Sequence, residues 1–117
     1  MIPADKNDVG TAEAIVASGN AADPRLLEWV QDLNWPVAQT LAPFLASAGG
    51  VLVPGIREVL ASQDDTWKWS VITGVVARSP ELVALLCPEL ERLAAAPSLG
   101  ELAEDLDRMA SELLRAM

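Results

Sequence analysis

The sequence predicts an all-α fold, an α-α superhelix of about seven helices stacked as antiparallel pairs. Pro24, Pro54 and Pro88 each open a short amphipathic segment, and the steps of 30 and 34 residues between them lie in the range of helical repeats. Apolar residues recur at helical spacing along most of the chain. No stretch of the sequence alternates regularly enough to predict a strand. Helix pairs that bury their apolar faces against neighbouring pairs explain all three observations.

The first two helices are predicted from caps and stops. Asp8 or Thr11 is expected to cap the first helix, and Gly19 suits a left-handed stop at its end. Asp23 followed by proline predicts the start of a second helix, because proline fits the first turn, where its missing N–H is not needed. We expect this second helix to end near Asp32.

The third and fourth helices follow a similar logic. Asn34 is expected to cap the third helix, whose broad apolar stripe runs to the glycine pair that starts at Gly49. Pro43 lies inside that stripe and predicts a kink. The fourth helix is expected to begin at Pro54 and to stop by Ser62.

Acidic residues predict the start of the fifth helix. Asp64 and Asp65 are expected to cap it, and it is expected to continue to Ala77. Gly74 lies inside it and costs about 1 kcal/mol in helix propensity, which favours a role in close helix packing.

The rest of the chain is predicted to hold two helices. One begins at Ser79 and is kinked or briefly broken at Pro88. The other begins with the capping box formed by Ser98 and Glu101, and the apolar residues after it repeat at helical spacing to the end of the chain. We therefore expect one continuous last helix.

Composition is typical of a folded protein and limits the function classes. Hydrophobic residues make up 51% of the 117 residues and charged residues 21%, so we expect a single helical domain over residues 1–117. Eight basic against 17 acidic residues give a net charge of −9, which disfavours nucleic acid as a partner. The chain has no histidine, which removes Cys-His and Ser-His nucleophile pairs and most zinc sites. The single cysteine, Cys87, is expected to be a buried small hydrophobe.

Neither a membrane segment nor a secretory signal is expected. The longest uncharged run, residues 37–56, is interrupted by prolines and glycines, so it does not fit a spanning helix. The amino-terminal residues lack the basic region and apolar stretch of a secretory signal. A cytoplasmic protein is therefore expected.

An internal repeat adds detail to the fold prediction. At an offset of 34 residues Trp35 falls on Trp69 and Pro54 on Pro88, with several apolar positions also matched. The order of elements, a helix and then a proline-led helix, resembles HEAT repeats. Asp32 and Asp65 occupy the turn position of that pattern.

Two tryptophan-bearing segments also resemble a known family. They read Leu26-Leu-Glu-Trp29-Val-Gln-Asp32-Leu-Asn34-Trp35-Pro36-Val37-Ala38 and Asp64-Asp65-Thr-Trp67-Lys68-Trp69. Together they are similar to a small uncharacterised bacterial family whose members share "WLQDxNWPVA" and "DDxWK" segments. The resemblance covers most of the chain and implies a HEAT-like helical domain in a bacterial protein, with no catalytic residues to carry over. Val30 stands where the family has leucine and Trp69 where it usually has tyrosine, and both keep an apolar or aromatic character.

These two segments also hold the candidate site. Its members are polar or aromatic residues at turns that the repeat makes equivalent: Glu28, Asp32, Asn34, Trp35, Asp64, Asp65, Trp67 and Lys68. In one interpretation the acids and the asparagine cap helices while the tryptophans fill the core between repeats. In the other, two acidic turns and an exposed tryptophan form a docking surface for a basic protein.

We rank binding above catalysis. The leading hypothesis is a HEAT-like protein–protein interaction module, with an immunity-type inhibitor of a toxin as one concrete version, and a homodimer would also suit the 51% apolar composition. No cofactor, metal or enzymatic activity is expected. The alternative is a carboxylate-based enzyme using Asp32 and Asp65, with a divalent metal bound by these residues and Asp64. The spacing of these acids matches no calcium loop. Net charge also disfavours a helical DNA-glycosylase-like activity.

Overall fold

The computed structural model describes residues 2–20 and 23–117, and the chain is helical throughout, with no strand in either range. Eight α-helices and three 3₁₀ helices (η) follow one another there. They are α1 (Val9–Ser18), η1 (Pro24–Val30), α2 (Pro36–Ala48), η2 (Gly49–Leu52), α3 (Val53–Ala61), α4 (Asp65–Gly74), η3 (Val76–Arg78), α5 (Pro80–Leu85), α6 (Cys87–Ala95), α7 (Leu99–Ala103) and α8 (Leu106–Arg115). The all-α prediction is confirmed.

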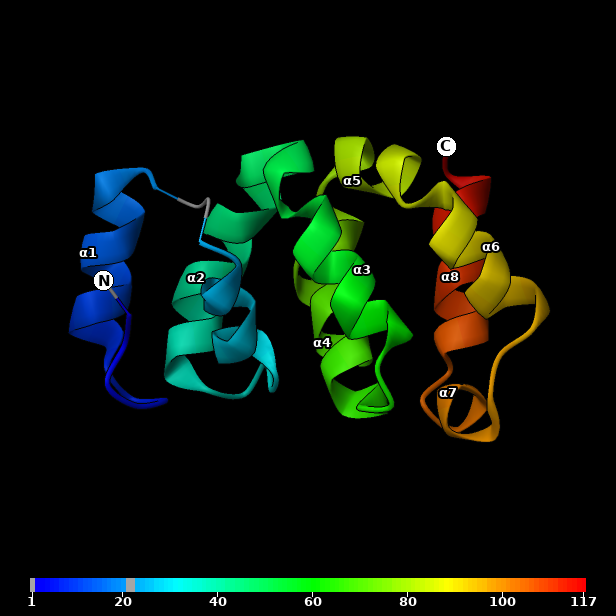
Figure 1. Cartoon of the computed structure of the whole chain (residues 1–117), viewed down its shortest axis with the longest axis horizontal. Helices are drawn as coiled ribbons and strands as arrows, with labels where there is room; N and C mark the ends of the chain where they lie inside the picture. The colour runs from blue at the N-terminus through cyan, green and yellow to red at the C-terminus, as the bar shows by residue number, and fades with distance from the viewer. Residues whose placement is uncertain (1, 21–22) are drawn as a thin grey trace.

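The helices stand side by side in an elongated row. Figure 1 shows the row running from α1 at one end to α6 and α8 at the other, and the molecule measures 40 × 25 × 19 Å. Helix α1 packs on α2, η1 packs on α2, α3 and α4, and α6 packs on α8. Each helix therefore buries its apolar face mainly against its neighbours in the row.

Most of the predicted caps are confirmed, because a cap depends only on residues within one turn. The capping side chains accept a backbone N–H two or three residues ahead, and they belong to Asp8, Asp23, Asp64, Ser79 and Ser98. Both hydrogen bonds of the Ser98–Glu101 capping box are present. Gly19 ends α1 in the left-handed conformation, with φ 71°.

Two helix predictions near the amino-terminal half need correction. The second segment is a 3₁₀ helix that ends at Val30. Asn34 does not cap α2: Trp35 holds that position without a side-chain bond, and the Asn34 N–H donates to Asp32 Oδ1 at 2.8 Å. Pro43 lies within α2, where the sequence places it. The Asp32 carboxylate closes the turn that precedes α2 and does not cap the helix.

The fifth predicted helix ends early. Helix α4 stops at Gly74, and residues 76–78 form the separate 3₁₀ helix η3. A Cβ atom at Gly74 would lie 2.6 Å from Leu33 Cδ2 and 3.5 Å from Ala42 Cβ. The predicted role of Gly74 in close packing is therefore confirmed.

The prediction of one continuous last helix is wrong. It is divided into α7 and α8 by Asp105, whose φ of 58° is left-handed. The break turns the chain so that Leu106 and Ala110 are fully buried, and α8 packs on α6. Leu99, the first residue of α7, is 87% exposed. The break predicted at Pro88 is found just before it, between α5 and α6.

Cys87 is half-buried rather than buried. Its Sγ donates to Glu91 Oε1 at 3.4 Å, and this hydrogen bond raises the pKa of the Cys87 thiol. A raised pKa disfavours the reactive thiolate.

One stretch of the described chain, Pro36–Ala61, is long and apolar enough to cross a membrane by length and composition. It spans α2, η2 and α3, and Gly49 interrupts it with φ 70°. Within its most apolar window, 44% of the residues are buried in the molecule. Core helices of water-soluble proteins pass the same test.

Candidate functional site

Four of the eight predicted site residues line two hollows that open beside the α3–α4 pair. Glu28 and Trp67 line a small hollow of about 190 Å³, whereas Asp65 and Lys68 line a larger cleft of about 590 Å³. Trp67 and Lys68 are adjacent in α4, and adjacent helical residues point about 100° apart. The sequence analysis placed all four residues on one candidate docking surface.

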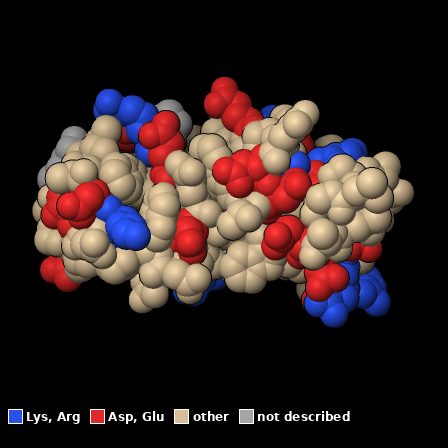
Figure 2. Space-filling model, turned by 90° about the horizontal axis from the view of Figure 1, so that it is seen from below, with Lys and Arg blue, Asp and Glu red and all other residues tan. Residues whose placement is uncertain are grey.

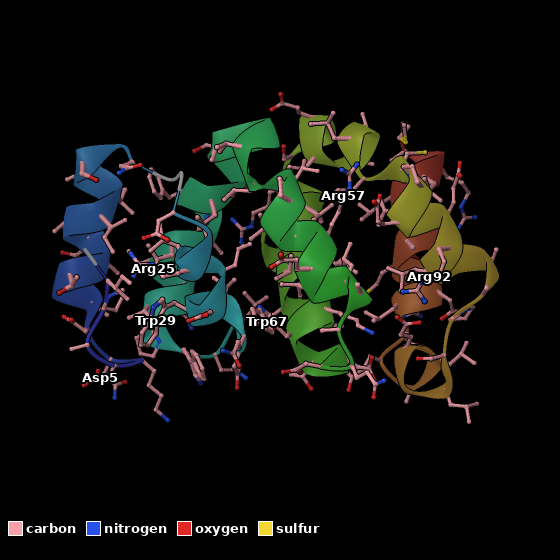
Figure 3. The ribbon with its side chains drawn as sticks, in the orientation of Figure 1. Asp5, Arg25, Trp29, Arg57, Trp67 and Arg92 are labelled. Atoms are coloured by element: carbon pink, nitrogen blue, oxygen red, sulfur yellow. The ribbon has the colours of Figure 1, made fainter. Side chains whose placement is uncertain are left out.

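The small hollow, called here the acidic tryptophan hollow, is built by three elements. Its lining residues are Leu27 and Glu28 from η1, Gly55, Glu58 and Val59 from α3, and Trp67 from α4. The Trp67 indole is half-buried, and its Nε1–H donates to the Leu27 carbonyl oxygen at 3.0 Å. Figure 3 shows Trp67 between η1 and α4. Glu28 and Glu58 are both exposed at this hollow.

The larger hollow, called here the polar cleft, contains a buried ion cluster. Its lining residues are Leu60, Ala61, Ser62, Gln63, Asp65, Lys68, Arg92, Ser98 and Glu101. Lys68 is only 4% exposed, and its Nζ donates to Asp65 Oδ1 at 3.0 Å and to Glu101 Oε2 at 2.9 Å. Arg92 donates to both carboxylate oxygens of Glu101. Figure 3 shows that Arg57 and Arg92 reach into the space between α3 and α6.

Electrostatics fix the charge states of this cluster. The Arg92 hydrogen bonds hold the pKa of Glu101 far below its ordinary value, against the effect of burial, with further help from the Ser98 N–H and Lys68. Burial alone would lower the pKa of Lys68, but hydrogen bonds to Glu101 and Asp65 outweigh it and raise the pKa. Glu101 stays ionised and Lys68 stays protonated at neutral pH. Neither group is therefore suited to exchange protons with a substrate there.

The remaining candidate residues have local structural contacts. Asp32 closes the turn before α2, and the exposed Asn34 supplies the N–H that it accepts. The Trp35 ring packs on Trp29, with ring centroids 6.5 Å apart and planes tilted by 58°. Asp64 caps α4 by accepting the Trp67 N–H at 3.0 Å.

Two features of these hollows escaped the sequence analysis. Glu58 was not singled out, although it lines the acidic tryptophan hollow together with Glu28. Glu101 was recognised only as part of a capping box, because its partner Lys68 lies 33 residues away in the sequence. No local pattern signals that contact. Among the residues that the structure describes, no group of three or more Cys, Asp or Glu side chains could hold a metal ion.

Comparison with known proteins assigns a family but no activity. No curated protein matches the chain. A family described as a domain of unknown function (DUF5071) matches residues 1–114, which is nearly the whole chain. The chain therefore belongs to this uncharacterised family.

Proposed function

We propose that this chain is a small HEAT-like protein–protein interaction module that binds a basic partner protein through an acidic, tryptophan-bearing edge. The acidic tryptophan hollow carries the proposal, because it places a half-buried indole beside the exposed carboxylates of Glu28 and Glu58. Tryptophan is enriched at binding hot spots, and acidic surfaces speed association with basic proteins. The row of packed helices in Figure 1 supports the HEAT-like part of the proposal.

The charge distribution agrees with a basic partner. Figure 2 shows the face seen from below in Figure 1, where groups of Asp and Glu occupy the middle and Lys and Arg lie mainly toward the two ends. With a net charge of −9, the whole molecule attracts cations over roughly one Debye length, about 8–10 Å at physiological salt. An immunity-type inhibitor of a basic toxin is one concrete version of this function.

No observation favours the enzyme alternative. Asp32 accepts a backbone N–H within its own turn, and Asp65 accepts from Lys68. Carboxylates with such partners act as structural acceptors, whereas catalytic acids and bases converge in an enclosed pocket.

The test is affinity capture from the native cell with two charge-reversed variants. Glu28→Lys with Glu58→Lys reverses the hollow, and the matched control, Glu13→Lys with Glu104→Lys, changes the net charge equally at exposed positions elsewhere. Asp64 and Asp65 are unsuitable because the first caps α4 and the second holds Lys68. We expect a basic protein to be captured by the wild type and the control and lost by the hollow variant. Equal capture by all three proteins would overturn the proposal.

A further inference from the structure

We propose that the acidic tryptophan hollow holds the guanidinium group of a single arginine side chain presented by the partner protein. The biological use of this contact rests on the proposed function above, but the contact itself is a property of the hollow. Its lining, defined above, combines two carboxylates with one indole.

The size of the hollow favours one side chain over a small-molecule ligand. Its volume is about 190 Å³, below the roughly 300–1,000 Å³ usual for cofactor and drug-sized ligands. That space suits one long side chain, which would enter from a docked protein surface while its backbone stays outside.

The charges in the hollow favour a cation. Glu28 and Glu58 come from different elements and are both exposed, and in the part of the chain that the structure describes the Glu58 carboxylate has no hydrogen bond or ion pair. The hydrogen bond and charge of Asp23 raise the pKa of Arg25, and the charge of Glu28 adds to this effect. However, the Arg25 guanidinium is already bound to Asp23, with Nη2 2.7 Å from Oδ2. The two glutamates therefore remain available to an incoming cation.

The tryptophan favours arginine over lysine. A guanidinium stacks on aromatic faces and bonds carboxylates with its planar fork, whereas an ammonium acts as a compact point charge. The Trp67 ring is already fixed by the 3.0 Å hydrogen bond from Nε1 to the Leu27 carbonyl oxygen. Binding an arginine would therefore cost little ordering of the indole, which is the advantage of a preorganised site.

The test is a nuclear magnetic resonance titration of the ¹⁵N-labelled full chain with Nα-acetyl-arginine methylamide. The neutral isostere Nα-acetyl-citrulline methylamide and the lysine analogue serve as comparison probes. A Trp67→Phe variant identifies the Trp67 indole N–H signal among those of the four tryptophans. We expect the arginine probe to shift that signal and the amide signals of Gly55 and Val59, with the lysine probe weaker and the citrulline probe inactive.

Variants make the result specific. Glu28→Gln with Glu58→Gln should raise the dissociation constant of the arginine probe about tenfold, because both charge-assisted hydrogen bonds are weakened. The control, Glu13→Gln with Glu104→Gln, should leave it within about twofold. Equal weakening by both variants, or shifts spread over the whole acidic surface, would overturn the proposal, as would a lysine probe that binds better than arginine.

The two proposals can fail separately. If the hollow variant loses its captured partner but no arginine probe shifts the Trp67 signal, the edge is an interaction surface and the arginine assignment is wrong. If the probe binds at the hollow but reversal of Glu28 and Glu58 leaves capture unchanged, the arginine site stands and the proposed function is wrong.

Discussion

Two junctions in this molecule join α4 to its neighbours by different chemistry. At the η1 junction, Trp67 Nε1 donates to the Leu27 carbonyl oxygen, Ser70 Oγ donates to the Gln31 carbonyl oxygen, and Gly74 lets Leu33 approach closely. At the α6–α7 junction, the buried Lys68 and Glu101 form an ion cluster with the exposed Arg92. The first junction uses neutral groups, so acid leaves it unchanged. The second depends on the ionisation of one carboxylate.

The largest expected effect is at the ionic junction. Glu101→Gln leaves Lys68 buried with only Asp65 as an acidic partner, and breaking a buried pair in this way typically costs about 3 kcal/mol. Urea unfolding at pH 7 measures the loss, with Glu104→Gln, a change at the exposed residue that follows α7, as the control. A loss below about 1 kcal/mol would mean that the cluster is no stronger than a surface ion pair.

The second prediction concerns pH. The pKa of Glu101 is lowered in the folded state from its ordinary value of 4.5, so the unfolded chain binds more protons in acid. The stabilising contribution of Glu101 is therefore complete above about pH 5 and is lost as the pH falls below 4.5. The facing charged groups are Lys68, Arg92 and Asp65.

The measurement for that prediction is the stability of wild type and Glu101→Gln at pH 7, 5, 4 and 3. Carboxylates outside the cluster affect both proteins alike, so the difference between the two reports on Glu101 and on Asp65, which shares Lys68 with it. We expect the difference to shrink as the pH falls below about 4.5. A difference that stays constant down to pH 3 would contradict the assignment.

A smaller effect is expected at the neutral junction. Trp67→Phe removes the indole N–H that the Leu27 carbonyl accepts, and the loss of one such bond costs about 1 kcal/mol. Trp69→Phe is the comparison, because Trp69 is also half-buried in α4. We expect Trp67→Phe to lower the free energy of unfolding more than Trp69→Phe does, equally at pH 7 and pH 4. If the difference in stability between Trp67→Phe and Trp69→Phe changed between pH 7 and pH 4, the η1 junction would not be independent of acid, and the two junctions would not differ in this respect.

The smallest effect is expected at Gly74. In Gly74→Ala the new methyl group displaces the end of the Leu33 side chain, which destabilises the fold. The higher helix propensity of alanine offsets this by up to about 1 kcal/mol, so the free energy of unfolding should fall by less than about 1 kcal/mol. Gly10→Ala in α1 is the control, because no atom lies within 4 Å of its new Cβ atom, and it should stabilise the protein. Thermal unfolding of both variants would separate the effect of packing from that of helix propensity. If Gly74→Ala stabilised the protein as much as Gly10→Ala, the contact with Leu33 would carry no energetic cost.

The sequence predicted those features that depend on neighbouring residues. The all-helical fold and the caps at Asp8, Asp64 and Ser98 follow from spacing and from side chains within one turn. The split at Asp105 was missed because it is favoured by the packing of α8 on α6, which no local pattern contains.

The placement of the candidate residues was predicted in part. Glu28 and Trp67 line one hollow, as the prediction of a shared surface requires. Lys68 was assigned to the same docking surface, although its side chain is buried. A lysine that follows two aspartates in the sequence is typical of an exposed surface. The burial of Lys68 is favourable only because it pairs with Glu101, which is distant in the sequence. Glu58 was missed because α3 comes beside η1 only in the folded chain.

The Glu101 carboxylate has one further consequence, for the cooperativity of folding. The same group that closes the first turn of α7 on the Ser98 N–H also receives Lys68 from α4 and Arg92 from α6. Fraying of that short helix would therefore release both long-range contacts, and loss of either contact would loosen the helix. Three segments separated in the sequence should thus open and close as one unit in native-state hydrogen exchange.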